Sequence, residues 1–231
     1  MQQIYSLDEL NYYIEKFDIS DVFEKDMRNF MELHSFQRGE QIYRTSEKTE
    51  YLYFLVKGKF KVFTTPKNGK TLLLRFYQPF QVLGDVELIC QVNSICNLEV
   101  LNEVTCIGIP LEIIRDNCMK DTKFLNYIAQ NLAQKLLESS ISSSINLIYP
   151  LENRLASYIL ASLQDDENYQ GINGIATNKL TDMADFLGTS YRHLNRTLSI
   201  FQSKKLIKKH RNFIEIIDRK KLEELAGDLY K

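Results

Sequence analysis

The chain has 231 residues, 44% of them hydrophobic, so it is long enough to form one large or two modest domains with real cores. Its 29 basic residues nearly balance its 30 acidic ones, which excludes a generally polycationic protein and requires any nucleic-acid binding to be local. No apolar run approaches the ~18 residues that span a bilayer, and the N-terminus lacks a basic segment followed by an apolar one, so we expect a cytoplasmic protein without membrane association.

The first segment, residues 6–31, has a helical pattern. Ser6 and Glu9 have the spacing of a capping box. Apolar side chains recur on one face of this predicted helix, at Leu7, Leu10, Ile14 and Phe17.

Residues 33–109 have the pattern of a β-sandwich or jelly roll. Short apolar stretches alternate there with turn signals at Gly39, Gly58, Asn68-Gly69 and Gly84. Asn-Gly between two strand-like runs is a strong hairpin signal. The helices expected on either side make this an α+β chain.

Helical periodicity returns after Pro110 and predicts a long helix over residues 121–148. A helix of this length is ~42 Å long, more than a small domain needs to cover itself, so part of its apolar stripe is expected to face a partner. An ordinary core-covering helix is the alternative. The predicted dimer-interface residues are Leu125, Ile128, Leu132 and Leu136.

Pro150 is expected to begin another helix, because proline suits a first helical turn. A polar loop from 164 to 174, two short helices, a strand pair near 206–217 and a terminal helix from about Arg219 complete the predicted order. The predicted domains are therefore 1–120, a linking helix at 121–148, and a winged-helix unit at 149–231.

Residues 180–198 have the spacing of a helix-turn-helix. Gly188 supplies the turn, where a positive φ is tolerated by glycine, and Ser190 offers an N-cap to the second helix. Leu194 and Leu198 face inward by their spacing. The outer side is left with Tyr191, Arg192, Asn195, Arg196 and Ser199.

The charge distribution points to DNA. Residues 186–214 contain seven Lys or Arg and no Asp or Glu, and the rest of the chain has 22 basic against 30 acidic residues, a sum of about −8. Tyr191, Arg192 and Arg196 occupy the first two turns of the second helix, which reach base edges in this motif. The predicted DNA-backbone contacts are Thr189, Ser190, His193, Lys204, Lys205, Lys208, Lys209 and Arg211. A solvated basic face is the alternative.

The chain resembles transcription regulators of the Crp/Fnr superfamily over nearly its whole length. Residues 36–42, 52–62 and 84–88 are similar to the family's cyclic-nucleotide-binding-like β-barrel, the long helix to its dimerisation helix, and the C-terminal third to its winged helix-turn-helix. Residues 150–160 and 187–194 resemble the YeiL-like branch. The resemblance implies base contacts at Tyr191, Arg192 and Arg196. Because Arg192 stands where the family has an acidic residue, we expect a different operator.

The resemblance also implies an effector pocket at Gly84, Asp85, Glu87 and Ser94. The family's cyclic-nucleotide receptors hold the ribose with a Gly-Glu pair and the phosphate with an Arg beside Ser or Thr. Here no Arg or Lys lies between Arg75 and Arg115, so cyclic AMP is not the expected effector, whose identity stays open.

Other cofactors have weak support in the sequence. An iron–sulfur cluster of the family's kind needs an N-terminal Cys set, and the first cysteine here is Cys90. His34 is the only histidine in the sensor region and is interpreted as a structural residue, not a haem ligand. Cys90 and Cys96 flank the predicted pocket and are candidates for a thiol switch.

The sequence contains no recognisable enzyme signature. Gly69-Lys70-Thr71 imitates the end of a phosphate-binding loop, but Thr64 stands where that motif requires glycine. Three histidines, at 34, 193 and 210, do not supply the clustered ligands of a metal-dependent barrel enzyme, so no metal site is predicted.

We therefore interpret the chain as a homodimeric, sequence-specific DNA-binding regulator of an inverted-repeat operator, under control of an unidentified signal in the β-barrel. The resemblance also implies RNA polymerase as a partner. The alternative is a ligand- or redox-sensing module that acts on a protein partner.

Overall fold

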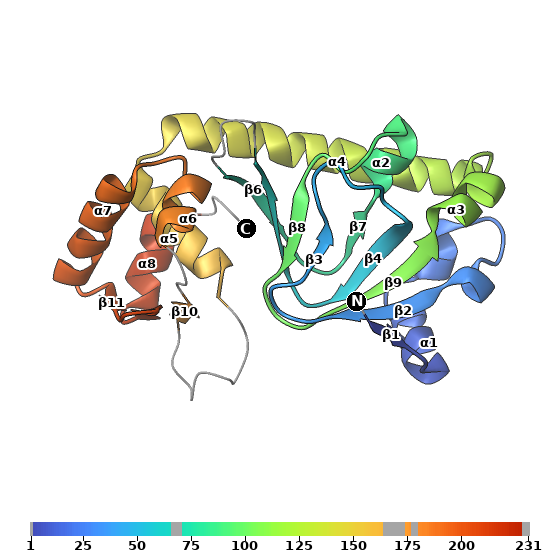
Figure 1. The fold of residues 1–231 in the computed structure, drawn as a ribbon, viewed down its shortest axis with the longest axis horizontal. Helices are drawn as coiled ribbons and strands as arrows, with labels where there is room; N and C mark the ends of the chain where they lie inside the picture. The colour runs from blue at the N-terminus through green and yellow to red at the C-terminus, as the bar shows by residue number, and fades with distance from the viewer. Residues whose placement is uncertain (1, 66–70, 164–173, 177–179, 228–231) are drawn as a thin grey trace. The chain divides into compact units, whose positions relative to one another are not determined.

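The computed structural model describes residues 2–65, 71–163, 174–176 and 180–227 (Figure 1). Three features predicted above lie wholly or largely outside these residues: the Asn68-Gly69 turn, the Gly69-Lys70-Thr71 tripeptide and the polar loop after 163. The chain divides into two compact units, Met1–Val62 with Tyr77–Glu138 and Phe63–Phe76 with Ser139–Lys231. Within the described residues, no helix combines the length and hydropathy that a membrane span requires.

The N-terminal segment is less helical than predicted. It consists of β1 (Gln2–Ile4), α1 (Leu7–Lys16) and the 3-10 turns η1 (Ile19–Val22) and η2 (Arg28–Phe30). The Ser6 cap is confirmed, since its hydroxyl accepts from the Glu9 N–H at 3.2 Å. The predicted extent to residue 31 is wrong, because Asp18 adopts a left-handed conformation (φ 50°) that ends the helical run. Leu7 is also 76% exposed, so it does not share the buried face of Leu10 and Ile14.

The predicted jelly roll is confirmed as two sheets, and the pairs of the five-stranded sheet are all antiparallel. The five-stranded sheet has the order β1-β2-β9-β4-β7, and the four-stranded sheet has the order β3-β8-β5-β6. The strands of the first are β2 (Glu32–Phe36), β9 (Val104–Pro110), β4 (Tyr51–Lys57) and β7 (Gln81–Leu83); those of the second are β3 (Gln41–Tyr43), β8 (Asn97–Val100), β5 (Phe60–Thr64) and β6 (Leu72–Tyr77). In the first sheet, β9 lies centrally, and Ile107 pairs with Leu33 on one side and Phe54 on the other.

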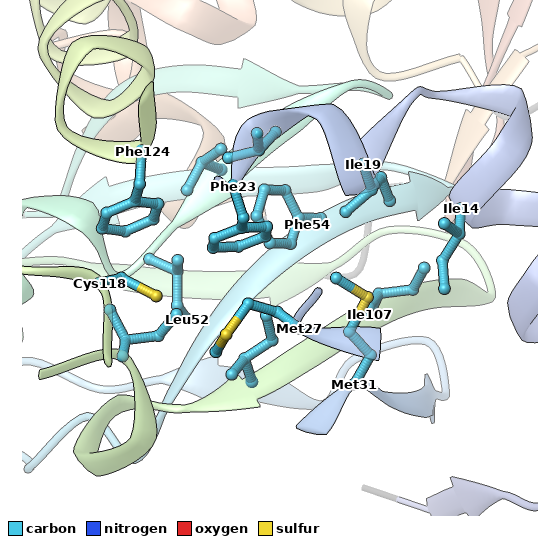
Figure 2. Packing of buried hydrophobic residues seen from close by; sticks show 14 of the residues in the cluster. Ile14, Ile19, Phe23, Met27, Met31, Leu52, Phe54, Ile107, Cys118 and Phe124 are labelled. Carbon is cyan, nitrogen blue, oxygen red and sulfur yellow. The ribbon is translucent and has the colours of Figure 1, made fainter. Parts of the chain in front are cut away.

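Aromatic side chains from distant segments fill the core of the first unit. Figure 2 shows the ring of Phe23 between those of Phe54 and Phe124. Phe23 stacks on Phe124 with centroids 5.3 Å apart and meets Phe54 edge-on at 6.3 Å. Each such fully buried side chain contributes about 1.5–3 kcal/mol relative to exposure. Two short helices, α2 (Asp85–Cys90) and α3 (Leu111–Cys118), precede the long helix that supplies Phe124.

That long helix, α4 (Thr122–Ile148), has the predicted length but a different face toward the barrel. Asp121 caps it by accepting from the Phe124 N–H at 2.9 Å. Ile128 lies one turn after Phe124 and is 1% exposed, packed in the barrel core. Its prediction as a dimer contact is therefore wrong, because the single apolar stripe read from the sequence combines a core-facing and an outward-facing row. Leu125 and Leu132 are half-buried and Leu136 is 69% exposed, so their role stays a prediction.

The second unit has the predicted helices and strand pair in the predicted order, and one further strand, β10, that was not predicted. They are α5 (Leu151–Ala161), β10 (Gly174–Ala176), α6 (Leu180–Phe186), α7 (Tyr191–Ser203), β11 (Ile207–Lys209), β12 (Phe213–Ile216) and α8 (Arg219–Ala226). Pro150 directly precedes α5, as expected. The three strands form an antiparallel sheet in the order β10-β12-β11. The core of the second unit includes Leu155, Leu194, Phe201 and Ile214, each fully buried.

Candidate nucleic-acid interface

The turn between α6 and α7 has the geometry that the sequence predicts. Gly188 has φ +59°, in the left-handed region that favours glycine. Its N–H donates to the Asp185 carbonyl and the Thr189 N–H donates to the Ala184 carbonyl, both at 2.9 Å. These bonds satisfy the last carbonyls of α6 and set the angle at which α7 leaves the turn.

Helix α7 begins with a side-chain cap and has one buried and one exposed face. The Ser190 hydroxyl accepts from the His193 N–H at 3.2 Å, as predicted for an N-cap. Leu194 and Leu198 are fully buried, which confirms their inward orientation. Tyr191, Arg192 and Arg196 are exposed, with Tyr191 at 51%. The residues predicted to contact bases thus lie on the solvent side of the first two turns.

A half-buried arginine, Arg154 of α5, holds this turn in place. Its guanidinium donates from Nη1 to the carbonyl of Leu187, the residue just before Gly188. Positive charge at the C-terminal end of a helix, here α6, is stabilised by the helix dipole. This positioning role was not predictable from the sequence, since only the fold brings residues 154 and 187 together.

Basic side chains continue beyond α7 toward the β11–β12 hairpin. Lys204, Lys205, Lys208 and Arg211 are exposed. Lys209 is half-buried and donates to the Asn195 amide oxygen at 3.0 Å, so one donor of its ammonium group is already used within the protein. Within the described part of the chain, none of the seven Lys and Arg side chains of residues 186–214 forms an ion pair with a carboxylate. The positive field of this surface is therefore not neutralised by neighbouring described carboxylates.

The three predicted backbone contacts that are neither lysine nor arginine have partners inside the motif. Ser190 is occupied as the α7 cap, and the Thr189 hydroxyl lies 3.4 Å from His193 Nδ1. His193 and Ser190 are exposed and Thr189 is half-buried, at the N-terminal end of α7. A helix N-terminus carries a partial positive charge that favours an anion such as phosphate.

In the first unit, the predicted effector residues surround the start of α2. Gly84 has φ +91°, and Asp85 is 1% exposed. The Lys135 ammonium of α4 lies 2.7 and 2.8 Å from the two Asp85 carboxylate oxygens and donates to the Val82 carbonyl at 2.7 Å. Glu87 is 5% exposed and accepts from the Ser94 hydroxyl at 3.2 Å.

Comparison with known proteins finds two known domains in this chain. A model of the cyclic nucleotide-binding domain matches residues 33–121, and a model of the Crp-like helix-turn-helix domain matches residues 153–225. The regulatory protein YeiL of Escherichia coli O157:H7 is 29% identical over 209 residues, covering 90% of this chain and 92% of the relative. The chain belongs to the Crp/Fnr superfamily. It is a transcription regulator of the Crp/Fnr type with a helix-turn-helix DNA-binding domain, and not an enzyme.

Solved structures of the Crp/Fnr superfamily share the fold. A putative regulator from Eubacterium rectale has a TM-score of 0.71 at 20% identity, covering 86% of this chain and 90% of the other. A transcriptional regulator from Thermus thermophilus has a TM-score of 0.66 at 22% identity, covering 86% of this chain and 98% of the other. At this identity the likeness concerns the fold.

A cyclic nucleotide does not fit the residues of this Crp/Fnr protein at the predicted pocket. The Lys135 ammonium already uses three donors on Asp85 and Val82, which leaves none for a phosphate. Glu87 adds a second buried carboxylate beside Ser94, and like charge repels a phosphate.

Two cavities lie in this region of the first unit. One cavity of about 690 Å³ is lined in part by Glu87, and another of about 750 Å³ lies beside Tyr43 and Tyr51. Neither is lined by Gly84, Asp85 or Ser94. The role of these three residues in effector binding therefore stays a prediction, and Glu87 is the predicted residue that lines one of the two cavities.

The remaining sensor candidates of this Crp/Fnr chain are packing residues or surface thiols. His34 is 1% exposed, with Nδ1 3.0 Å from the Tyr53 hydroxyl and Nε2 3.0 Å from a Glu32 carboxylate oxygen. Cys106 and Cys118 are buried, and burial raises the pKa of the Cys118 thiol to about 11. Cys90 is exposed and Cys96 half-buried, and neither forms a disulfide with another described cysteine.

Proposed function

We propose that the protein binds double-stranded DNA as a homodimer at an inverted-repeat operator, and that a signal received in the β-barrel unit changes its affinity for that operator. We further propose that it acts in the cytoplasm with RNA polymerase as its protein partner, as the family resemblance implies. The observation that carries the DNA part is the exposed basic face of α7.

The first two turns of α7 are suited to base recognition. Arg192 and Arg196 lie one turn apart on the exposed face, and Tyr191 precedes them at the helix start. A guanidinium fork donates bidentately to the O6 and N7 atoms of guanine. Two arginines one turn apart favour an operator half-site rich in guanine. An acidic residue at position 192 would favour a different half-site.

The surface after α7 is suited to phosphate contacts. Lys204, Lys205, Lys208 and Arg211 surround the end of α7 and the β11–β12 hairpin, and all four are exposed. Lysine and arginine at such positions neutralise phosphates and release counterions, independently of sequence. Lys209 contributes less directly, because it holds Asn195.

The outward row of α4 supports a homodimer. Leu136 is 69% and Leu137 60% exposed, and both lie away from the side of α4 that carries Phe124 and Ile128 into the barrel core. Pairing with the same helix of a second copy removes this apolar surface from water. A two-fold dimer places two recognition helices about 34 Å apart, one turn of DNA. A signal acts by favouring or disfavouring the dimer arrangement with this spacing.

The test is selection of genomic DNA fragments by the full-length protein, followed by footprinting of the retained fragments. We expect protection of two half-sites related by inverted repeat, with centres about one helical turn apart. Retention of all fragments alike at physiological salt overturns the proposal of sequence-specific binding, and a single protected half-site overturns that of a two-fold dimer.

A further inference from the structure

The first unit contains a cavity of about 690 Å³ whose walls are tied together by hydrogen bonds. The Ser94 N–H donates to the Glu47 carbonyl at 3.0 Å, and the Ser46 N–H donates back to the Ser94 carbonyl at 2.7 Å. On the α3 side, the Leu111 N–H donates to the Glu50 carbonyl at 2.8 Å. The loop before β4, the loop after α2 and helix α3 therefore form a preformed site of the size that small ligands occupy.

One side of the cavity carries a buried negative charge. Glu87 is 5% exposed, and among the described residues its carboxylate has a single hydrogen-bond partner, the Ser94 hydroxyl, and no cation. A buried carboxylate without a cation is costly and is stabilised by a positively charged donor. The Thr49 hydroxyl of the same cavity is also buried and, within the described part of the chain, has no hydrogen-bond partner.

The opposite charge lies at the same cavity. Lys48 and Arg115 both line it and both are exposed. Among the described residues, the only ion pair that either forms is that of Lys48 with Glu112, which is 3.9 Å long and largely exposed, so it contributes little in water. The Arg115 guanidinium presents a planar fork that matches a carboxylate bidentately.

Apolar side chains complete the lining. Leu88 and Leu111 line it and are buried, and Val92 and Met119 line it and are 45% and 37% exposed. The cavity thus combines one carboxylate, two cations and an aliphatic surface. This set is complementary to a small molecule that has an ammonium, a carboxylate and an apolar side chain.

We infer that this cavity binds a free α-amino acid or a closely related small zwitterion. Its ammonium binds the Glu87 carboxylate, its carboxylate binds Arg115 with Lys48 nearby, and its side chain packs on the aliphatic lining. Asp85 is paired with Lys135 and does not line this cavity, so the proposed site is separate from that ion pair. The inference does not depend on DNA binding and is tested on the protein alone.

The experiment is calorimetric titration of the full-length protein with each standard L-amino acid at millimolar concentration. We expect saturable binding of one or a few with apolar side chains. The N-acetyl derivative, which lacks the ammonium, and the amide derivative, which lacks the carboxylate, should each bind at least about tenfold more weakly, because each loses one charged partner. No saturable binding by any amino acid overturns the inference.

Variants separate the site from other surfaces. Arg115→Gln changes an exposed residue, so it should fold normally and weaken binding about tenfold or more. Glu87→Gln should weaken binding, because it removes the charged partner of the ligand's ammonium group. If the Glu87→Gln protein does not fold, the Arg115→Gln protein still tests the inference. Arg38→Gln is the control, an exposed arginine of the same unit that does not line the cavity, and should bind as the native protein does. Equal affinity of the native, Arg115→Gln and Arg38→Gln proteins places the ligand elsewhere and refutes this site.

Discussion

The Lys135 ammonium and the Asp85 carboxylate form a buried ion pair at 2.7 Å that joins α4 to the start of α2. The two side chains are 11% and 2% exposed. The ammonium also lies 5.3 Å from the centre of the Tyr77 ring. All three ammonium donors have partners. Removing either residue of the pair would leave the other charge buried without its partner.

Replacing Lys135 with methionine should therefore destabilise the first unit strongly. The variant leaves the Asp85 carboxylate buried without a cation, which costs about 3–5 kcal/mol. Urea denaturation measures the loss, and the double variant with Asp85→Asn should recover part of it. Lys123→Met is the matched control, since its pair with Asp21 is exposed and 3.8 Å long, and it should cost at most about 1 kcal/mol. Equal losses in the two lysine variants would contradict the buried-pair interpretation.

Arg196→Ala should relax base preference at one operator position. Loss of a bidentate contact to guanine costs about 1–3 kcal/mol on the preferred sequence and much less on variants of that base pair. Binding titrations against single-base operator variants measure this. Arg28→Ala, in the first unit, is the control and should leave both affinity and preference unchanged. Unaltered discrimination by the Arg196 variant would remove this residue from the set of base contacts.

Lys208→Ala should weaken binding to every DNA sequence by a similar factor. An exposed lysine that neutralises one phosphate contributes about one unit to the slope of log affinity against log salt, so the slope should fall by about one. Lys209→Ala should have a mixed effect, because Lys209 also holds Asn195 beside the recognition face. A salt slope identical to that of the native protein would show that Lys208 does not meet a phosphate.

Leu136→Lys should shift the protein from dimer to monomer. The substitution places a charge on the outward row of α4, where we propose that a second copy packs. Sedimentation measures the change, and operator affinity should fall with it because two half-sites no longer bind together. Met119→Lys is the control, a 37% exposed apolar residue outside α4. A dimer that resists Leu136→Lys at low protein concentration places the interface elsewhere.

Stability should fall at acidic pH partly because of His34. Burial lowers the pKa of His34 from the ordinary 6.5, and its hydrogen bond to Glu32 only partly opposes this. The unfolded chain takes up a proton as the pH drops below 6.5, whereas the folded chain does so only at a lower pH, so the stabilisation present above 6.5 is lost progressively below it.

His34→Gln should consequently flatten the pH dependence of the unfolding free energy between about pH 7 and pH 5.5. Denaturation curves across this range measure the difference between native and variant slopes. His210→Gln, at a 43% exposed histidine of the other unit, serves as the control. Parallel pH profiles for the native and His34→Gln proteins would refute a role for burial of this ring.

Much of the second unit was predictable because its signals are local. A cap at Ser190, a left-handed Gly188 and leucines four residues apart specify a helix, a turn and a second helix within about 20 consecutive residues. The acid-free basic window is likewise a property of consecutive residues. The end of α1 was not predictable in this way, because the backbone becomes left-handed at Asp18 without a glycine or proline to signal it.

The sequence by itself determined two properties of each segment: the kind of element it forms and the charge it carries. Both depend on residues that are neighbours along the chain. Only the tertiary structure decided which row of α4 enters the core, where Ile128 goes, and which cation neutralises Asp85. Lys135 lies 50 residues from Asp85 in the chain, and Arg115 lies on a different helix from Glu87, so no local pattern could join either pair. Burial and ion pairing depend on which distant segments meet, and that is set by the packing of the whole unit.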